Sequence, residues 1–313
     1  MLVSGFTFIK NAVTLDYPVV EAIRAVLPLV DEFVVNVGRD LDDQLQPVPD
    51  DGTRALIESI DSPKIRIIES TWNPHTVTGG YVYAQQTDIA LLNCRGVWAF
   101  YVQCDEVVHE EDHEILRQAM SRHADNPRVD ALALQQLNFF GDYNTQVGVR
   151  PWRGRRRCWV VKPHHFVLSR GDAAGFTVHP KYKERGRKLR AVETPARQFH
   201  YNSVKSRKAF EAKLRNAAQY WSERALDVGA VTRDFYYQRM PRQFVTRFPG
   251  THPAVMAERI TQHPIELDHD APQWRTTLTA AERRLLIKSK LIDLTTDRWT
   301  GRGSYRLVSG RRR

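Results

Sequence analysis

The pattern of hydrophobic and polar positions in the first 140 residues alternates between two periods. Short runs rich in apolar, aromatic and β-branched residues predict buried strands over 4–11, 32–38, 64–70, 97–103 and 130–139. Between them, apolar residues at helical spacing predict helices over about 18–29, 51–60, 83–93 and 111–123. Strands separated by helices imply an α/β fold, with a mostly parallel sheet, right-handed crossovers and helices on both faces.

The pattern changes in the last third of the chain. Residues 206–221 and 279–299 have apolar side chains at helical spacing, and the second stretch opens with a capping box at Thr279. The sequence therefore predicts an α/β domain over 1–205. A mostly helical region over 206–313 is expected to pack on that domain and to help shape an acceptor site.

Length and composition are those of a globular protein. The chain has 313 residues, of which 42% are hydrophobic and 26% charged, and no apolar run approaches the roughly 20 residues that span a bilayer. The first residues lack the features of a secretory signal. Cys94, Cys104 and Cys158 show no C-x-x-C spacing, so neither a disulfide framework nor a structural zinc site is expected. These features predict a protein of the reducing cytoplasm.

A formal net charge of +10 indicates anionic partners. Basic residues cluster in 152–157, 181–190 and 311–313. Such clusters suit nucleotide phosphates, nucleic acid, or the acidic lipid headgroups of the inner membrane face, where the protein would bind peripherally. A solvated basic surface is an equal alternative, and charge alone does not choose between them.

The apolar run 97–103 ends in carboxylates that a buried strand does not need. Asp105 and Glu106 follow it directly. In a parallel sheet, ligands bind beyond the carboxyl ends of the strands, because loops and helix N-termini converge there. Hard oxygen ligands beside a phosphate-bearing substrate suit Mg²⁺ or Mn²⁺. The acids at 110–112 are instead expected to stabilise the N-terminus of the following helix.

Seven motifs carry a resemblance to a known family. In chain order they are SGFTFIKNA, EFVVNVG, DDGTRALIESI, AQQTDIAL, FYVQCDEVVHEED, RGDAAGF and FHY. Together they resemble the GT-A glycosyltransferases related to family 2, over residues 3–215. The resemblance implies a Rossmann-like GT-A fold. It also implies metal-assisted, inverting transfer of a sugar from a nucleoside-diphosphate sugar to an acceptor hydroxyl.

The resemblance further implies roles for individual residues. The positions that match the family's donor-binding segments are Thr7, Lys10, Asn11, Asp51, Gln85 and Gln86. Asp105 resembles the metal-binding aspartate of a divergent D-x-D motif, whose first position here is Gln103. His200, in Phe-His-Tyr, resembles the histidine that completes this metal site. The basic segment 152–157 is a candidate loop that closes over the donor diphosphate.

Sugar transfer also needs a base that takes the proton of the acceptor hydroxyl. Asp105 would serve the diphosphate, so a different acid is required. Asp172 is the candidate, because it follows an apolar strand over 159–168 and lies between glycines that allow close backbone approach to a ligand. A simple turn at Gly171 and Asp172 is the alternative. The further candidates for the base are Asp142, Glu106 and Glu110.

Other functions stay open from the sequence. One is a glycosyltransferase that modifies DNA or RNA, and another is a non-catalytic nucleic-acid-binding protein on the same fold. A third is a nucleotidyltransferase, which would release pyrophosphate from a nucleoside triphosphate. Nucleic-acid binding that falls steeply with salt and survives the loss of Asp105 would indicate the second function. For a glycosyltransferase, the acceptor classes in play are a glycan, a lipid-linked sugar and nucleic acid.

Overall fold

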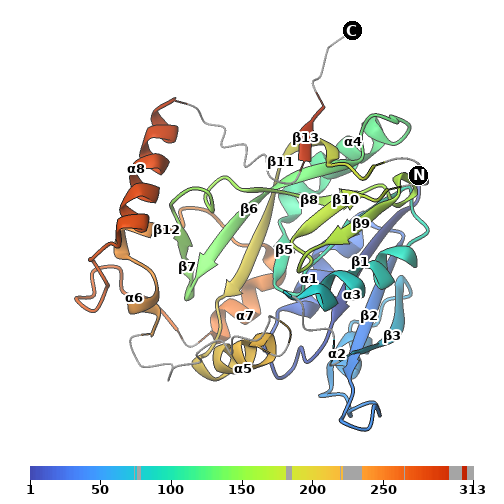
Figure 1. The fold of residues 1–313 in the computed structure, drawn as a ribbon, viewed down its shortest axis with the longest axis horizontal. Helices are drawn as coiled ribbons and strands as arrows, with labels where there is room; N and C mark the ends of the chain where they lie inside the picture. Colours follow the sequence, from blue (N-terminus) through green and yellow to red (C-terminus); the bar gives the residue numbers. More distant parts are fainter. Residues whose placement is uncertain are drawn as a thin grey trace.

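The computed structural model describes residues 1–73, 75, 79–180, 185–218, 220, 235–263, 265–295 and 305–308. Within them, a central sheet of eleven strands runs through the molecule, and a separate two-stranded hairpin lies beside it (Figure 1). One half of the central sheet is parallel and has the spatial order β3-β2-β1-β4. Its strands are β1 (Val3–Ile9), β2 (Glu32–Asp40), β3 (Ile65–Trp72) and β4 (Trp98–Tyr101).

Two strands of this half, β2 and β4, are buried on both faces. Phe33, Val34 and Val35 of β2 are fully buried, as are Phe100 and Tyr101 of β4. A continuous apolar run is what a parallel strand needs when helices cover both of its sides. The strand expected over 97–103 is shorter than predicted, because the chain turns after β4 and then enters β5 (Glu106–Val108).

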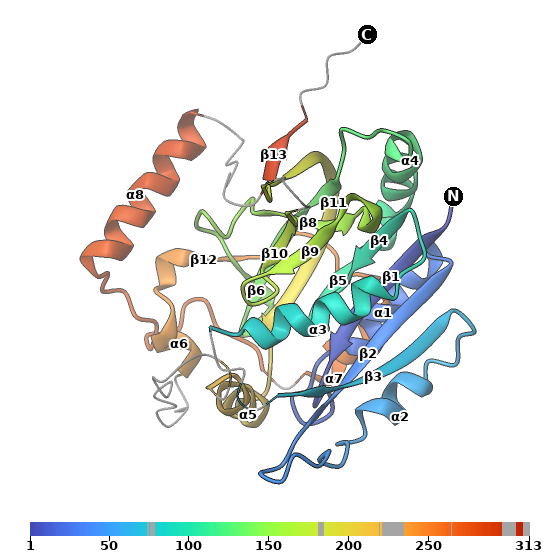
Figure 2. The same cartoon turned by 45° about the vertical axis from the view of Figure 1, so that its right-hand side comes forward.

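Helices cover both faces of the parallel half. α1 (Val19–Val26) and α2 (Thr53–Glu58) lead from β1 to β2 and from β2 to β3, whereas α3 (Tyr81–Leu92) leads from β3 back to β4. Right-handed crossovers place α3 on the opposite face from α1 and α2, because the chain reverses its direction across the sheet. Figure 2 shows α3 in front of the strands and α1 behind them. The predicted α/β class is confirmed.

The other half of the sheet is mixed. β8 (Arg156–Val161) runs antiparallel to β4 and to β6 (Ala131–Phe140), and β7 (Asp142–Val147) runs antiparallel to β6. β11 (Leu189–Ser203) is parallel to β6 and antiparallel to β5. The helix expected before β6 is α4 (His113–His123), which packs against β11.

The single apolar strand predicted over 159–168 is wrong. Its first residues belong to β8, Pro163 begins a 3₁₀ helix, and its last residues belong to β9 (Val167–Arg170). Proline cannot donate a ladder hydrogen bond, so a central strand does not continue through it. β9 pairs with β10 (Gly175–Val178) in the separate hairpin, and the turn of this hairpin carries Asp172.

Helices dominate the last third of the chain. They are α5 (Arg207–Ala218), α6 (Phe235–Arg239), α7 (Ala257–Gln262) and α8 (Ala280–Thr295). α5 and α8 match the two expected helices, and the predicted ends of those helices at 221 and 296–299 lie outside the described residues. α8 lies at the opposite end of the molecule from β3 (Figure 1). In the part of the chain that the structure describes, no helix is both long and apolar enough to cross a membrane.

Two strands of this region join the central sheet. β12 (Val245–Arg247) pairs with β7, and β13 (Tyr305–Leu307) pairs with β11. A second apolar cluster lies between β7 and the C-terminal helices and contains Phe140, Tyr236 and Trp274. The expected packing of the last third on the α/β part is therefore visible, while the division at residue 205 stays a prediction.

Candidate active site

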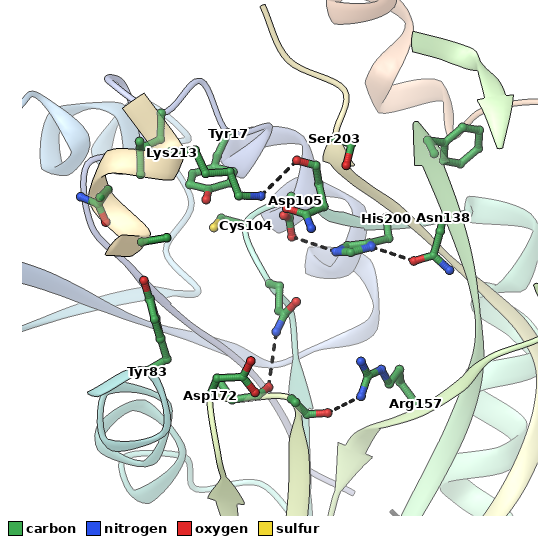
Figure 3. Close-up of a pocket in the computed structure, with 18 of the residues that line it drawn as sticks. Tyr17, Tyr83, Cys104, Asp105, Asn138, Arg157, Asp172, His200, Ser203 and Lys213 are labelled. Carbon is green, nitrogen blue, oxygen red and sulfur yellow. Dashed lines mark hydrogen bonds and ion pairs between the residues drawn. The ribbon is translucent and has the colours of Figure 1, made fainter. Parts of the chain in front are cut away.

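A cavity of about 500 Å³ opens beyond the carboxyl ends of β1 and β4. β1 and β4 are neighbours where the strand order reverses, because the chain runs from β1 out to β3 and then returns to β4. Ligands of such sheets bind at this point. Lys10 follows β1 and Asp105 follows β4, and the walls are completed by Asp172 of the β9–β10 turn, His200 of β11 and Lys213 of α5 (Figure 3). Segments far apart in the sequence therefore converge where such a sheet binds its ligand.

Asp105 and His200 face each other in this cavity. β5 and β11 pair antiparallel with Glu106 opposite His200, which brings the residue before Glu106 close to the histidine. The backbone N–H of Tyr201 donates to the C=O of Asp105 at 2.8 Å. Nε2 of His200 lies 3.8 Å from Oδ1 of Asp105. The structure thus brings together the two residues that the sequence predicts as metal ligands.

The proton on the His200 ring is fixed by its neighbours. Nδ2 of Asn138 donates to the C=O of Trp152 at 3.1 Å, which turns Oδ1 of Asn138 toward Nδ1 of His200, 3.0 Å away. An amide oxygen only accepts, so Nδ1 carries the proton. Burial lowers the pKa of His200 to about 4, against the raising effect of Asp105. The ring is therefore neutral near pH 7, and the lone pair of Nε2 points at a carboxylate oxygen.

This arrangement fits a small divalent cation. Two lone pairs that face each other repel unless a cation or a hydrogen-bond donor lies between them. The 3.8 Å separation is within reach of one cation bonded to both atoms, since such bonds are about 2.0–2.2 Å long. The hydrogen bond from Nδ1 to Asn138 is also the outer contact that metal-binding histidines usually make.

Asp105 and His200 would supply only part of a coordination shell. Across the described residues, no group of three or more His, Cys, Asp or Glu side chains is arranged to hold a metal ion. Mg²⁺ and Mn²⁺ commonly take their remaining ligands from water and substrate phosphates. The residues therefore fit a cation that binds together with a phosphate-bearing ligand.

Asp172 lines the same cavity from the β9–β10 turn. Gly171 and Ala173 on either side of it have positive φ angles of 63° and 60°. The Asp172 carboxylate is half-buried and points into the cavity (Figure 3), and no described residue donates a hydrogen bond to it. The segment is a turn, and this turn presents an open carboxylate to the cavity. The role of Asp172 as the base stays a prediction.

The cavity carries an excess of positive charge. Among the described lining residues, the lysines and arginines are Lys10, Arg155, Arg157, Lys213 and Arg239, whereas the carboxylates are Asp105 and Asp172. Nζ of Lys213 donates to the C=O of Asn202 at 3.0 Å, and Arg239 lies over the rings of Phe210 and Phe235. No carboxylate of the described residues pairs with Arg155. Such a surface favours an anionic ligand.

Besides Asp105, Lys10 is the predicted donor-binding residue that lines the cavity. Its Nζ donates to Oδ1 of Asp40 at 2.5 Å and to the Tyr220 hydroxyl at 3.0 Å, and lies 4.3 Å from the ring centre of Trp72. Burial lowers the pKa of Lys10, although Asp40 opposes this. The side chain lines the cavity and is already paired.

Five other predicted donor-binding residues lie outside the cavity as the described residues define it: Thr7, Asn11, Asp51, Gln85 and Gln86. Gln86 is buried and its Oε1 accepts a hydrogen bond from Asn36 at 2.9 Å, which ties α3 to β2. Asp51 accepts from the backbone N–H of Thr14 at 2.9 Å, which ties the loop after β1 to the start of α2. These contacts organise the fold around the cavity, and a role in donor binding stays a prediction.

The remaining candidate bases lie outside the cavity. Glu106 is fully buried, its Oε1 accepts from Gln136 at 2.8 Å, and burial raises the pKa of Glu106 to about 8. Asp142 accepts from two backbone N–H groups at 3.0 and 2.7 Å. Glu110 is exposed and accepts from the backbone N–H of Ala254 at 3.1 Å. None of the three lines the cavity that the described residues enclose.

The sequence analysis missed Asn138 and Lys213. Asn138 is a half-buried polar residue near the end of β6, and a polar residue just before two phenylalanines at the end of a strand is a signal that could have been used. Lys213 lies on a helix with many basic residues, so its sequence context gave no signal. Its place in the cavity depends on how α5 packs.

Comparisons with known proteins return a likeness of fold. No protein-family model and no curated protein matches the chain. Among solved structures, S. aureus TarS residues 1–349 is 11% identical over 70% of this chain and 64% of that chain, with a TM-score of 0.37. The same TarS fragment is 13% identical in complex with UDP and in complex with UDP-GlcNAc, with TM-scores of 0.37 and 0.36.

These similarities cover about two thirds of the TarS fragment, 64% to 66% of that chain. The GT-A type of the fold stays a prediction of the sequence resemblance.

Proposed function

We propose that the chain is a metal-assisted glycosyltransferase that moves a sugar from a nucleoside-diphosphate sugar to an acceptor hydroxyl. The observation that carries the proposal is the pair of facing lone pairs on Asp105 and His200. This pair lies at the switch point of the sheet, in a cavity rich in arginine and lysine. The sequence resemblance adds the class of reaction and its inverting course.

Each group in the cavity would have one role. Mg²⁺ or Mn²⁺ held by Asp105 and His200 would stabilise the negative charge of the departing diphosphate. Arg155 and Lys213 would face the same charge. Asp172 would take the proton of the acceptor hydroxyl. The oxygen of that hydroxyl would bond to the anomeric carbon of the sugar as the bond from this carbon to the diphosphate breaks.

We propose in addition a class of acceptor and a location in the cell. A glycan, a lipid-linked sugar and nucleic acid all present hydroxyl groups, and the basic surface would attract any of them that is anionic. α8 exposes Arg283, Arg284 and Lys290 beside the exposed apolar side chains of Ile287 and Leu294. This surface supports a cytoplasmic enzyme that contacts an anionic membrane peripherally.

The test is calorimetry with nucleoside diphosphates and nucleotide sugars, with and without Mn²⁺. UDP and UDP-GlcNAc, which the TarS crystals contain, are suitable first probes. We expect one donor to bind only with the cation, and Asp105→Ala and His200→Ala to weaken that binding. Glu110→Ala is the matched control, because Glu110 is an exposed carboxylate outside the cavity.

Two results would contradict the proposal. One is an absence of binding across the donor panel together with salt-sensitive nucleic-acid binding that survives Asp105→Ala, which would favour the nucleic-acid-binding alternative. The other is release of pyrophosphate from a nucleoside triphosphate, which would indicate a nucleotidyltransferase.

A further inference from the structure

The turn that carries Asp172 is held by two side chains of the central sheet. Nε2 of Gln103, which follows β4, donates to the backbone C=O of Ala173 at 3.4 Å. The guanidinium of Arg157, on β8, donates to the backbone C=O of Ala174. Figure 3 shows these two bonds below the Asp105 and His200 pair, on the side of the cavity where Asp172 lies.

The rest of the hairpin is anchored separately. The ring of Phe176, on β10, packs edge-on against Tyr101 and Trp159, with ring centres 5.4 and 6.0 Å apart. On β9, the backbone N–H of Ser169 donates to Oδ1 of Asp88 at 2.7 Å. The strands of the hairpin are therefore docked without Gln103 and Arg157. What these two side chains control is the tip, residues 171–174.

The tip does not hold its shape by its own backbone preference. Ala173 has a φ of 60°, which residues with a Cβ seldom adopt. Ala173 is buried, so its C=O needs a donor from the protein. Among the described residues, Gln103 supplies a side-chain donor to the C=O of Ala173, and Arg157 supplies one to the C=O of Ala174.

Position 103 needs an amide for this contact. A carboxylate has no proton to donate at neutral pH and would face the C=O of Ala173 with like partial charge. Gln103 is the first position of the D-x-D-like motif and lies two residues before Asp105. Glutamine at this position therefore offers a hydrogen-bond donor to the opposite wall of the cavity, where an aspartate would offer a metal ligand.

Arg157 is held in place for the same task. Its guanidinium lies 5.6 Å from the ring centre of Trp159, a fully buried side chain of the same strand. A stacked guanidinium has few other rotamers, so its hydrogen bond to the turn is preorganised.

We propose that Gln103 and Arg157 are positioning residues that clamp the Asp172 turn. Gln103 ties the turn to the segment that carries Asp105, and Arg157 ties it to β8. The clamp fixes the distance between Asp172, the proposed base, and Asp105 at the proposed donor site. The expected effect of the clamp on turnover rests on the proposed function. The clamp itself is measurable without turnover.

The first test is amide hydrogen exchange of the peptide that covers 171–174. Gln103→Met keeps the length of the side chain and removes the donor, and we expect about tenfold faster exchange at the tip, as the loss of one hydrogen bond permits. Exchange in β9 and β10 should stay at the wild-type rate. Gln118→Met is the matched control, because Nε2 of Gln118 donates on α4, away from the cavity.

The second test separates binding from chemistry. With Gln103→Met we expect the donor affinity to stay within about twofold of wild type, while kcat falls about tenfold to hundredfold because the base is misplaced. Gln103→Glu gives opposite predictions for the two roles of position 103. If Gln103 is part of the clamp, the Gln103→Glu variant should lose turnover. If position 103 instead binds the metal, this variant should bind the cation more tightly and keep its turnover.

Arg157→Lys keeps the charge and loses the planar fork, and it serves as the second variant if Gln103→Met does not fold. If both residues act through the same turn, the double variant that combines Gln103→Met with Arg157→Lys should lose less kcat than the product of the two single-variant losses. Exchange at 171–174 that stays at the wild-type rate in both single variants would overturn the clamp. Faster exchange in a protein that transfers no sugar would retain the clamp and reject the proposed function.

Discussion

Asp105 and Asp172 differ from Asp130 and Asp112 in what occupies their oxygens. Asp130, before β6, is fully buried and accepts from the backbone N–H of Arg190 at 2.7 Å, and from the side chains of Arg187, Arg190 and His165. Asp112 accepts from the backbone N–H and Nε of Arg197 at 2.7 and 2.9 Å. No described residue donates a hydrogen bond to the side chain of Asp172, and the recorded side-chain neighbour of Asp105 is His200 at 3.8 Å.

The difference separates carboxylates that are paired within the fold from carboxylates that are open to a ligand. Burial raises the pKa of Asp130, but hydrogen bonds from Arg187 and Arg190 outweigh it and hold that pKa well below its ordinary value. A carboxylate in this state stabilises the fold and has no lone pair left for a ligand. An aspartate in the cavity keeps its lone pairs for a cation or a proton, so the two groups should respond differently to loss of charge.

The largest effect is expected for Asp105→Asn. The amide is a weaker ligand and removes the charge beside His200, so we expect kcat/KM for the cation-dependent transfer to fall by about a thousandfold. Thermal stability should change little, because no described residue donates a hydrogen bond to the Asp105 side chain. Steady-state kinetics with a Mn²⁺ titration checks this, and full activity would remove Asp105 from the site.

Asp172→Asn should reduce turnover by about a hundredfold or more, because the amide cannot accept the proton of the acceptor hydroxyl. The affinity for the donor should stay near the wild-type value. Calorimetry of donor binding beside turnover measures both. An unchanged kcat would assign the base to another group.

Asp130→Asn should act on stability instead. Arg187 and Arg190 lose their charged partner but are partly exposed and can turn to water, so we expect the free energy of unfolding to fall by about 2 kcal/mol. The activity per folded molecule should be unchanged. Denaturant unfolding and a kcat measurement on the same sample distinguish this result from a loss of catalysis.

The smallest effect is a change with pH. The pKa of Asp130 is lower in the folded chain than in the unfolded chain, so its contribution is complete above the ordinary aspartate pKa of about 4 and is lost as the pH falls further. The gap in unfolding free energy between wild type and Asp130→Asn should therefore narrow below about pH 4. A gap that is constant with pH would contradict the assignment.

The sequence predicted the parallel half of the sheet and the place of Asp105 at the end of a strand. Both predictions depend on the spacing of apolar residues within one short segment, which can be read without knowing the fold. The sequence also placed His200 beside Asp105, through the family resemblance. It did not predict the break at Pro163 as a strand end, although proline gives a local signal for one. Nor did it predict which donor-motif residues face the cavity.

The contacts that the sequence does not predict join residues from different segments of the chain. The role of Asn138 follows from the C=O of Trp152 on one side and the His200 ring on the other. The role of Gln103 follows from Ala173, 70 positions along the chain. Hydrogen bonds between segments so far apart have no periodicity, so only the folded chain reveals them.

The two C-terminal strands have a consequence for solubility. β12 covers the outer edge of β7, and β13 pairs with β11, so both strands are flanked by segments from the end of the chain. A fragment that ended at residue 205 would present these edges, together with the apolar face around Phe140, to other molecules. Unpaired edges of this kind recruit further strands and lead to aggregation. The last third of the chain therefore protects the rest of the sheet from self-association, and it also lines the cavity.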